Sequence, residues 1–116
     1  MLYLKITKPT IIKIRNKEIL LKKGFYIYVG SAFGKGGLSS RIHRHLRKEK
    51  KVHWHIDQIT TKDICQFYGV AVFPNEKSEC EISNLMSRFE NLQPIKYFGS
   101  SDCRNNCISH FFYVKP

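Results

Sequence analysis

A run of glycines followed at once by basic residues is the part of this sequence whose residue types best suit phosphate chemistry. Residues 24–37 read GFYIYVGSAFGKGG, and LSSRIHRHLRKEKK follows directly. Glycines permit close approach of the backbone to a ligand, and a glycine-rich loop that opens a helix presents N–H groups to phosphate. Arg41 and Arg44 would grip phosphate oxygens, with His45 one turn beyond Arg41. No GxxxxGK[ST] pattern is present, which argues against a nucleotide-binding P-loop.

The charge balance favours a polyanionic partner. The chain has 20 Lys and Arg against 9 Asp and Glu, a formal net charge of +11. A mixed-sign surface would be enough for solubility, so this excess favours nucleic acid, ahead of an acidic membrane. Much of the charge lies within 41–51, where only Glu49 opposes it. The alternative interpretation of that run is a solvated helix face.

Length and composition indicate one globular domain over residues 1–116. With 42% hydrophobic residues, a chain of 116 residues can bury roughly two-thirds of its unfolded surface. No apolar run approaches the ~20 residues that span a bilayer, and MLYLKITKP does not resemble a secretion signal. We expect a cytoplasmic, nucleoid-associated protein with no membrane contact, whose cysteines are reduced by default.

The elements that must position these residues include several strands. Strand patterns occur in MLYLKIT, in IIKIR and EILLKKG (a hairpin turning at Asn16-Lys17), in GFYIYVG, in ICQFYGVAVF and in HFFYVK. In GFYIYVG, alternation separates Tyr26 and Tyr28 on one face from Phe25, Ile27 and Val29 on the other.

Two further segments have helical spacing. Residues 38–50 place Leu38, Ile42 and Leu46 on one stripe, with Arg41 and His45 beside it. Residues 78–92 begin with a capping box, formed by Ser78 and Glu81. They also have an apolar stripe at helical spacing, which consists of Ile82, Leu85, Met86 and Phe89. The predicted fold class is α+β, a small mixed or antiparallel β-sheet flanked by α-helices.

Several segments of the sequence, taken together, carry a resemblance to a known family. They are YVG at 28–30, SAFGKGGLSSRIHRH, HWHID, CE, FGSSDC and SHFFY. The family that they resemble is the GIY-YIG nuclease superfamily. The resemblance is closest to a mainly archaeal branch that is sometimes fused to endonuclease III-type glycosylases. It covers nearly the whole chain. Met1, Leu2 and Tyr3 would form the first signature tripeptide, and 28–30 the second.

The resemblance implies a metal-dependent endonuclease that hydrolyses DNA phosphodiester bonds, in repair or on branched or damaged DNA. It implies one Mg²⁺ or Mn²⁺ ion held by Glu81, and a single carboxylate suffices for Mg²⁺ because this ion retains most of its waters. In the same comparison Tyr3 would help to activate water, and Tyr28 would be a catalytic residue that helps to shape the site and position water. Arg41 would steady the scissile phosphate, and His45 would be a further polar catalytic group.

DNA is the expected partner, with RNA as an alternative and a repair glycosylase as a protein partner. Most of the expected contacts are to the nucleic-acid backbone, without sequence readout. The expected nucleic-acid-binding residues are Lys35, Arg44, Arg47, Lys48, His53 and His55.

Three departures from the superfamily pattern bear on turnover. Met1 stands where glycine is usual, the two signatures are separated by a hairpin, and the late asparagine has no clear counterpart beyond Asn105 or Asn106. The alternative function is therefore a nucleic-acid-binding module without turnover, or a glycosylase accessory domain.

Other metal and thiol sites remain open from the sequence. On a strand, His53, His55 and Asp57 would imitate a two-histidine, one-carboxylate centre; on a helix only His53 and Asp57 would align. The tail offers zinc ligands in Cys103, Cys107 and His110, with Cys80 as a further ligand or as a disulfide partner. A hydrolase triad around Ser109-His110 lacks a GxSxG elbow.

Overall fold

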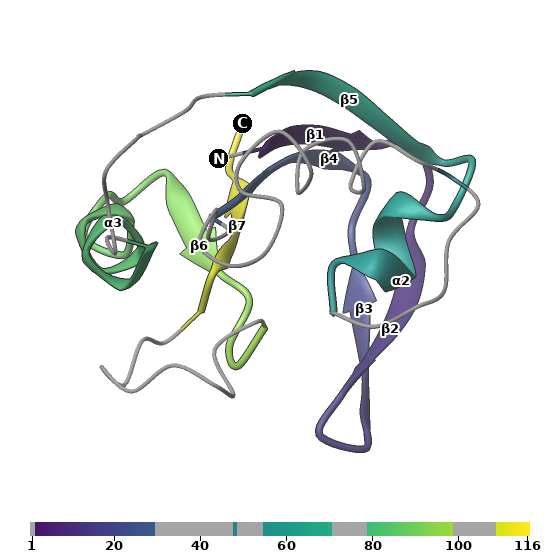
Figure 1. Ribbon diagram of the computed structural model, residues 1–116, viewed down its shortest axis with the longest axis horizontal. Coiled ribbons are helices and arrows are strands. Elements are labelled where there is room, and N and C mark those ends of the chain that lie inside the picture. Colours follow the sequence, from purple (N-terminus) through teal and green to yellow (C-terminus); the bar gives the residue numbers. More distant parts are fainter. Residues whose placement is uncertain (1, 30–47, 49–54, 71–78, 99–108) are drawn as a thin grey trace, which may run out of the picture.

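The computed structural model describes residues 2–29, 48, 55–70, 79–98 and 109–116 (Figure 1). It is a small α+β domain, and every strand pair among the described residues is antiparallel. The main sheet has the strand order β5-β1-β4-β7-β6. Its strands are β1 (Leu2–Ile6), β4 (Gly24–Tyr28), β5 (Cys65–Val70), β6 (Leu92–Pro94) and β7 (Phe111–Val114). The predicted α+β class and the antiparallel sheet are confirmed.

Alternation along β1 and β4 gives the main sheet two chemically different faces. Leu2 pairs with Tyr28 and Leu4 with Tyr26, and all four side chains are buried. We call this side the core face. The opposite side, on which helix α3 packs, carries the intervening residues and is called the α3 face. Its members on β1, β4 and β7 are Tyr3, Lys5, Phe25, Ile27 and Phe112.

The core face is covered by the β2–β3 hairpin and helix α2, as Figure 1 shows. Ile12, Leu21 and Ile59 are almost completely buried against it. The Tyr26 ring stacks on Phe111, with ring centroids 4.9 Å apart. The Tyr26 hydroxyl donates a 2.6 Å hydrogen bond to the carbonyl oxygen of Lys22, so its polar group is satisfied inside the domain.

The predicted hairpin is present as β2 (Thr10–Ile14) and β3 (Lys17–Leu21). Ile14 pairs with Lys17, which leaves Arg15 and Asn16 as a two-residue turn, one residue earlier than the turn predicted at Asn16-Lys17. Both have positive φ, 51° and 65°, as the type I′ turn of a twisted hairpin requires. The Arg15 guanidinium lies 4.3 Å from the centre of the Tyr97 ring, an attraction that helps to hold the turn.

Side chains from the α2 region hold the hairpin along its outer edge. The Gln58 amide accepts a 2.8 Å hydrogen bond from the N–H of Lys13 and donates one of 2.9 Å to the Lys13 carbonyl. The Lys62 ammonium donates to the Thr10 hydroxyl at 2.6 Å and to the Ile11 carbonyl at 3.4 Å. These contacts join residues about fifty positions apart in the chain, and so they fix the hairpin to α2 and the turn that follows it.

Two helices lie in the described residues, α2 (Asp57–Thr60) and α3 (Glu79–Met86). The helix predicted over 78–92 is therefore shorter than expected. At its end the Ser87 hydroxyl donates to the Asn84 carbonyl, and bonds to the third preceding residue follow, such as Phe89 N–H to the Met86 carbonyl. The chain then turns, because Leu92 must pair with Val114 as the start of β6.

The apolar stripe predicted for α3 is right for two of its residues and wrong for two. Met86 is buried and Ile82 packs beside it on the α3 face. Leu85 and Phe89, in contrast, are each 57% exposed. The helix ends before Phe89, so this side chain does not follow the helical face. Apart from Lys48, the residues of the helix predicted over 38–50 lie outside the described residues, as does the cap predicted at Ser78.

The backbone at Gly24 generates the first prediction. Gly24 has φ +146°, and a Cβ there would lie 2.8 Å from Cε1 of Tyr113. Gly24→Ala should lower the free energy of unfolding by about 1–3 kcal/mol, because alanine strains the backbone and displaces the tyrosine ring. Urea denaturation followed by circular dichroism measures the change. Gly69→Ala is the matched control, since its Cβ would meet the Tyr3 ring at an ordinary 3.6 Å. Equal losses in both variants would contradict this reasoning.

Candidate active site

Tyr3 occupies the middle of the α3 face. It pairs with Ile27 on one side and with Gly69 on the other, and it is half-buried. Gly69 adjoins the tyrosine ring, since an added Cβ would lie 3.6 Å from Cδ2 of Tyr3, an ordinary van der Waals contact. β1 has neighbours on both sides, β4 and β5, so two hydrogen-bonded ladders hold the strand that carries Tyr3.

Helix α3 packs on this same face. Ile82 and Met86 form one cluster with Ile27 and Phe112 of the sheet. Ile27 is also the direct cross-strand partner of Tyr3, so α3 and Tyr3 lie over the same side of the sheet. Glu81 immediately precedes Ile82 in α3, although its side chain lies outside the part that the structure describes. The backbone thus brings the helix that carries Glu81 to the face that carries Tyr3.

Tyr28 lies on the opposite face from Tyr3. It pairs with Leu2, one residue before Tyr3, and alternation directs it into the core. Only 9% of Tyr28 is exposed, and its ring has Phe98 at 6.3 Å and Phe111 at 6.5 Å between centroids. The two signature tyrosines are therefore not brought to one face. Tyr28 contributes to the packing beneath the end of β4.

Several expected site residues cannot be located. Arg41 and His45 lie outside the described residues, as do Asn105 and Asn106. The same holds for the expected contacts Lys35, Arg44, Arg47 and His53, and for Cys103 and Cys107. Cys65 is a buried thiol.

Lys48 has backbone partners inside the domain. Its ammonium donates two hydrogen bonds of 2.7 Å, to the carbonyl oxygens of Lys62 and Cys65. It also lies 5.4 Å from the centre of the Phe67 ring. These contacts bind it to the turn between α2 and β5, so a phosphate would have to compete with two charge-assisted hydrogen bonds.

The segment HWHID is described only from His55 onward. His55 and Ile56 form a turn, and Asp57 begins α2, so the strand arrangement that would align His55 with Asp57 is not formed. His55 is half-buried, with its ring 5.6 Å from that of Phe98. Asp57 is completely buried.

Ser109 and His110 immediately precede strand β7 of the main sheet. The Ser109 hydroxyl exchanges two 2.9 Å hydrogen bonds with the backbone of Phe111, which gives it a structural role and not that of a nucleophile. The His110 backbone accepts from Val29 and donates to Phe98, both at 2.8 Å. Burial of the His110 side chain lowers the pKa of its imidazole.

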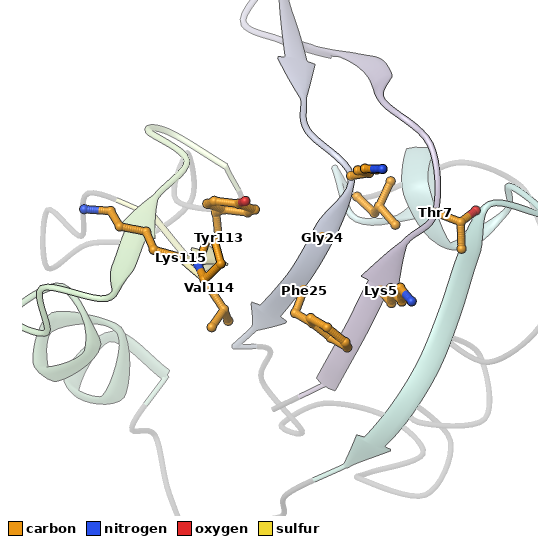
Figure 2. Close-up of a pocket in the computed structure, with 10 residues that line it drawn as sticks. Lys5, Thr7, Gly24, Phe25, Tyr113, Val114 and Lys115 are labelled. Atoms are coloured by element: carbon orange, nitrogen blue, oxygen red, sulfur yellow. The ribbon is translucent and has the colours of Figure 1, made fainter.

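A pocket of about 660 Å³ opens at the far end of the sheet, where β1, β4 and β7 meet (Figure 2). Figure 2 shows Lys5, Gly24 and Phe25 on one side of it, and Tyr113, Val114 and Lys115 on the other. The sequence alone does not predict this pocket. The lysines that line the pocket are scattered in the sequence. They become neighbours only when three strands that are far apart in the chain pair with one another.

Comparison with known proteins identifies the family to which the chain belongs. The model of DUF123, described as a domain of unknown function, matches residues 1–116. Neither the curated proteins nor the solved structures contain a match.

Two further findings concern membrane spans and metal ions. In the described part of the chain, no helix has the length and apolar character to cross a bilayer. No group of three or more histidine, cysteine, aspartate or glutamate side chains among those residues could hold a metal ion.

The contacts of Lys48 give a second prediction. Lys48→Met keeps most of the aliphatic stem but removes the ammonium that serves two carbonyl groups. We expect the free energy of unfolding to fall by about 1.5–3 kcal/mol, the range for hydrogen bonds to charged groups. Lys17→Met, at an exposed hairpin position, removes the same charge and is the control. A Lys48 variant of unchanged stability that loses far more DNA affinity than the control would instead assign Lys48 to nucleic-acid contact.

The buried imidazole of His110 gives a third prediction. Because its pKa is lower in the folded than in the unfolded state, the unfolded state takes up the proton more readily as pH falls. The associated stability is complete above the unfolded value of about 6.5 and is lost as pH falls through the folded value. Denaturation midpoints of wild type and His110→Gln at pH 7.5, 6.5 and 5.5 measure it. The difference between the two proteins should shrink toward acid; a constant difference would contradict the assignment.

Proposed function

We propose that this protein is a metal-dependent endonuclease of the GIY-YIG type that hydrolyses phosphodiester bonds in DNA. One structural observation carries the proposal: Tyr3 and helix α3, which includes Glu81, lie over the same face of the sheet. The sequence resemblance assigns chemistry to these same two positions. The net charge of +11 supports a polyanionic substrate.

The proposed site divides the chemistry among few groups. Glu81 would hold one Mg²⁺ or Mn²⁺ ion, which when bound lowers the pKa of an attacking water and neutralises charge on the phosphoryl oxygens. The Tyr3 hydroxyl would orient that water, and only as a phenolate would Tyr3 accept its proton. Arg41 would pair with the non-bridging oxygens, and His45 would add a polar contact nearby. An ion that keeps most of its waters needs one or two carboxylates, so the donor set fits magnesium.

Tyr28 has a different task in this proposal. Its ring packs under the end of β4 from the core face, next to Val29, which packs on the α3 face. Tyr28 would therefore support the backbone from which the glycine-rich segment departs, without reaching the reacting atoms. It is a positioning residue in this scheme, and Tyr3 is the catalytic tyrosine.

The proposed substrate is DNA in repair, or DNA that is branched or damaged, within the cytoplasm and at the nucleoid. The family resemblance suggests a repair glycosylase as a partner. A second function is favoured by Met1, which replaces the usual glycine of the first signature. This second candidate function is that of a nucleic-acid-binding module, or of a glycosylase accessory domain, without turnover.

Nicking of supercoiled plasmid by the purified protein tests the two functions. With Mg²⁺ or Mn²⁺ we expect nicking that EDTA abolishes and that Glu81→Gln lowers at least about 100-fold, the usual scale for loss of electrostatic stabilisation. Tyr3→Phe should lower the rate by a similar factor, because it removes one hydroxyl involved in proton transfer.

Matched controls separate these effects from charge and folding. Glu90→Gln makes the same change at an exposed position, and Tyr97→Phe removes a hydroxyl from an exposed ring. Both should nick at the wild-type rate. Equal nicking by Glu81→Gln and wild type would overturn the assignment of Glu81. Binding without nicking of plasmid, branched or damaged DNA would favour the module.

A further inference from the structure

Two aromatic rings stand exposed side by side on the α3 face. Phe25 is 47% exposed and Tyr68 is 58% exposed. Their ring centroids are 5.4 Å apart, and the planes meet at 69°, an edge-to-face contact. Large aromatic side chains are costly to leave in water, so an adjacent exposed pair on a sheet indicates a binding surface.

A β-bulge directs Tyr68 to this surface. Tyr3 pairs with Gly69, whereas Leu4 pairs with Phe67, so Tyr68 is the extra residue of β5. A regular strand would alternate, but the bulge allows Tyr68 to reach Phe25 on the face that Gly69 also occupies. Bulges commonly re-aim a side chain in this way.

Lysines border the aromatic pair. The Lys5 ammonium lies 5.5 Å from the centre of the Phe25 ring. Lys5 and Phe25 also line the pocket of about 660 Å³ shown in Figure 2, together with Lys23 and Lys115. No acidic side chain is among the described residues that line this pocket. Among the described residues, the surface therefore combines exposed π-faces with lysine side chains.

We propose that this surface binds an unpaired stretch of DNA, with bases stacked on Phe25 and Tyr68 and phosphates held by Lys5, Lys23 and Lys115. An aromatic ring can stack on any base, but the bases of a duplex are already stacked on one another. Only a single strand or a splayed junction offers free base faces. Lysines without acidic neighbours suit its phosphates and carry no sequence preference.

This surface lies on the same face of the sheet as Tyr3 of the candidate active site. Lys5 follows Tyr3 by two residues on β1, so the two side chains share a face about 7 Å apart. A strand stacked on the aromatic pair would continue toward Tyr3. The inference rests on the proposed function for the choice of DNA, and it specifies the substrate as one that contains unpaired nucleotides beside the scissile bond.

Binding measured without cleavage tests this inference separately from nuclease activity. Fluorescence anisotropy in EDTA would compare a labelled 15-nucleotide oligodeoxythymidine with a 15-base-pair duplex. Phe25→Ala/Tyr68→Ala should weaken binding of the single strand about tenfold, and of the duplex less than threefold, because stacking is lost only where bases are free. Lys23→Gln and Lys115→Gln should each reduce the salt dependence of single-strand binding by one phosphate contact.

The chain offers a matched control. Phe89 and Tyr97 are 57% and 49% exposed, and neither belongs to the aromatic pair, so Phe89→Ala/Tyr97→Ala removes the same side-chain types. It should leave both affinities unchanged. Circular dichroism and a thermal melt would verify folding of each variant.

Each outcome decides a different point. Equal losses on single strand and duplex, or a loss as large in the control, would overturn the stacking surface whatever the nicking assay gives. A selective loss without nicking would retain the surface and assign the protein to the binding module. Tighter binding of oligouridine than of oligodeoxythymidine, with the same selective loss, would overturn the choice of DNA.

Discussion

The register of β1 between β4 and β5 is the constraint on which the rest of this domain depends. Leu2, Leu4 and Ile6 are all buried on the core face, so the hydrophobic effect fixes which residues alternate to the other side. A slip of one residue would bury Tyr3 and Lys5 and expose three aliphatic side chains. The chemistry proposed at Tyr3 is therefore positioned by the aliphatic residues on either side of it in the chain.

Period-two alternation made most of the sheet predictable. The strands at 2–6, 24–28, 65–70 and 111–114 were expected, as was the hairpin, because each has a clear pattern or a turn signal. β6 was not expected. Its three residues include Pro94, which lacks an N–H, and the strand exists because it pairs with Phe112 and its neighbours in β7. Such pairing depends on tertiary context and leaves no local signal.

The site was less predictable than the sheet. The alternation within GFYIYVG separated the tyrosine face correctly, but it could not show that the first signature tyrosine belongs to the other side. That fact depends on how β1 registers with β4. The bulge at Tyr68 is likewise a property of pairing with β1. Lys48 lies in a run of basic residues, and its hydrogen bonds to two carbonyl groups elsewhere in the chain have no signal in the sequence.

In the proposed function, the two faces of the sheet have different roles, one in stability and the other in recognition. The core face is closed by the hairpin, α2 and stacked aromatic rings such as Tyr26 and Phe111. The α3 face is closed only in part among the described residues, with Phe112 covered and Phe25 open to solvent. A change on the open part alters few packed contacts, so binding properties there can vary while the fold persists.

The hydrogen bonds between Gln58 and the hairpin have a consequence for how copies of this chain behave in solution. An edge strand with free N–H and carbonyl groups is a template on which another chain can add a strand. In β2 the outward-facing groups of Lys13 are both taken by the Gln58 amide, and the Ile11 carbonyl is taken by Lys62. The Gln58 amide thus occupies the two backbone groups of Lys13 with which a strand from another chain would need to pair. Although Ile11 and Leu20 expose apolar surface beside that edge, it is closed to β-type aggregation at these positions.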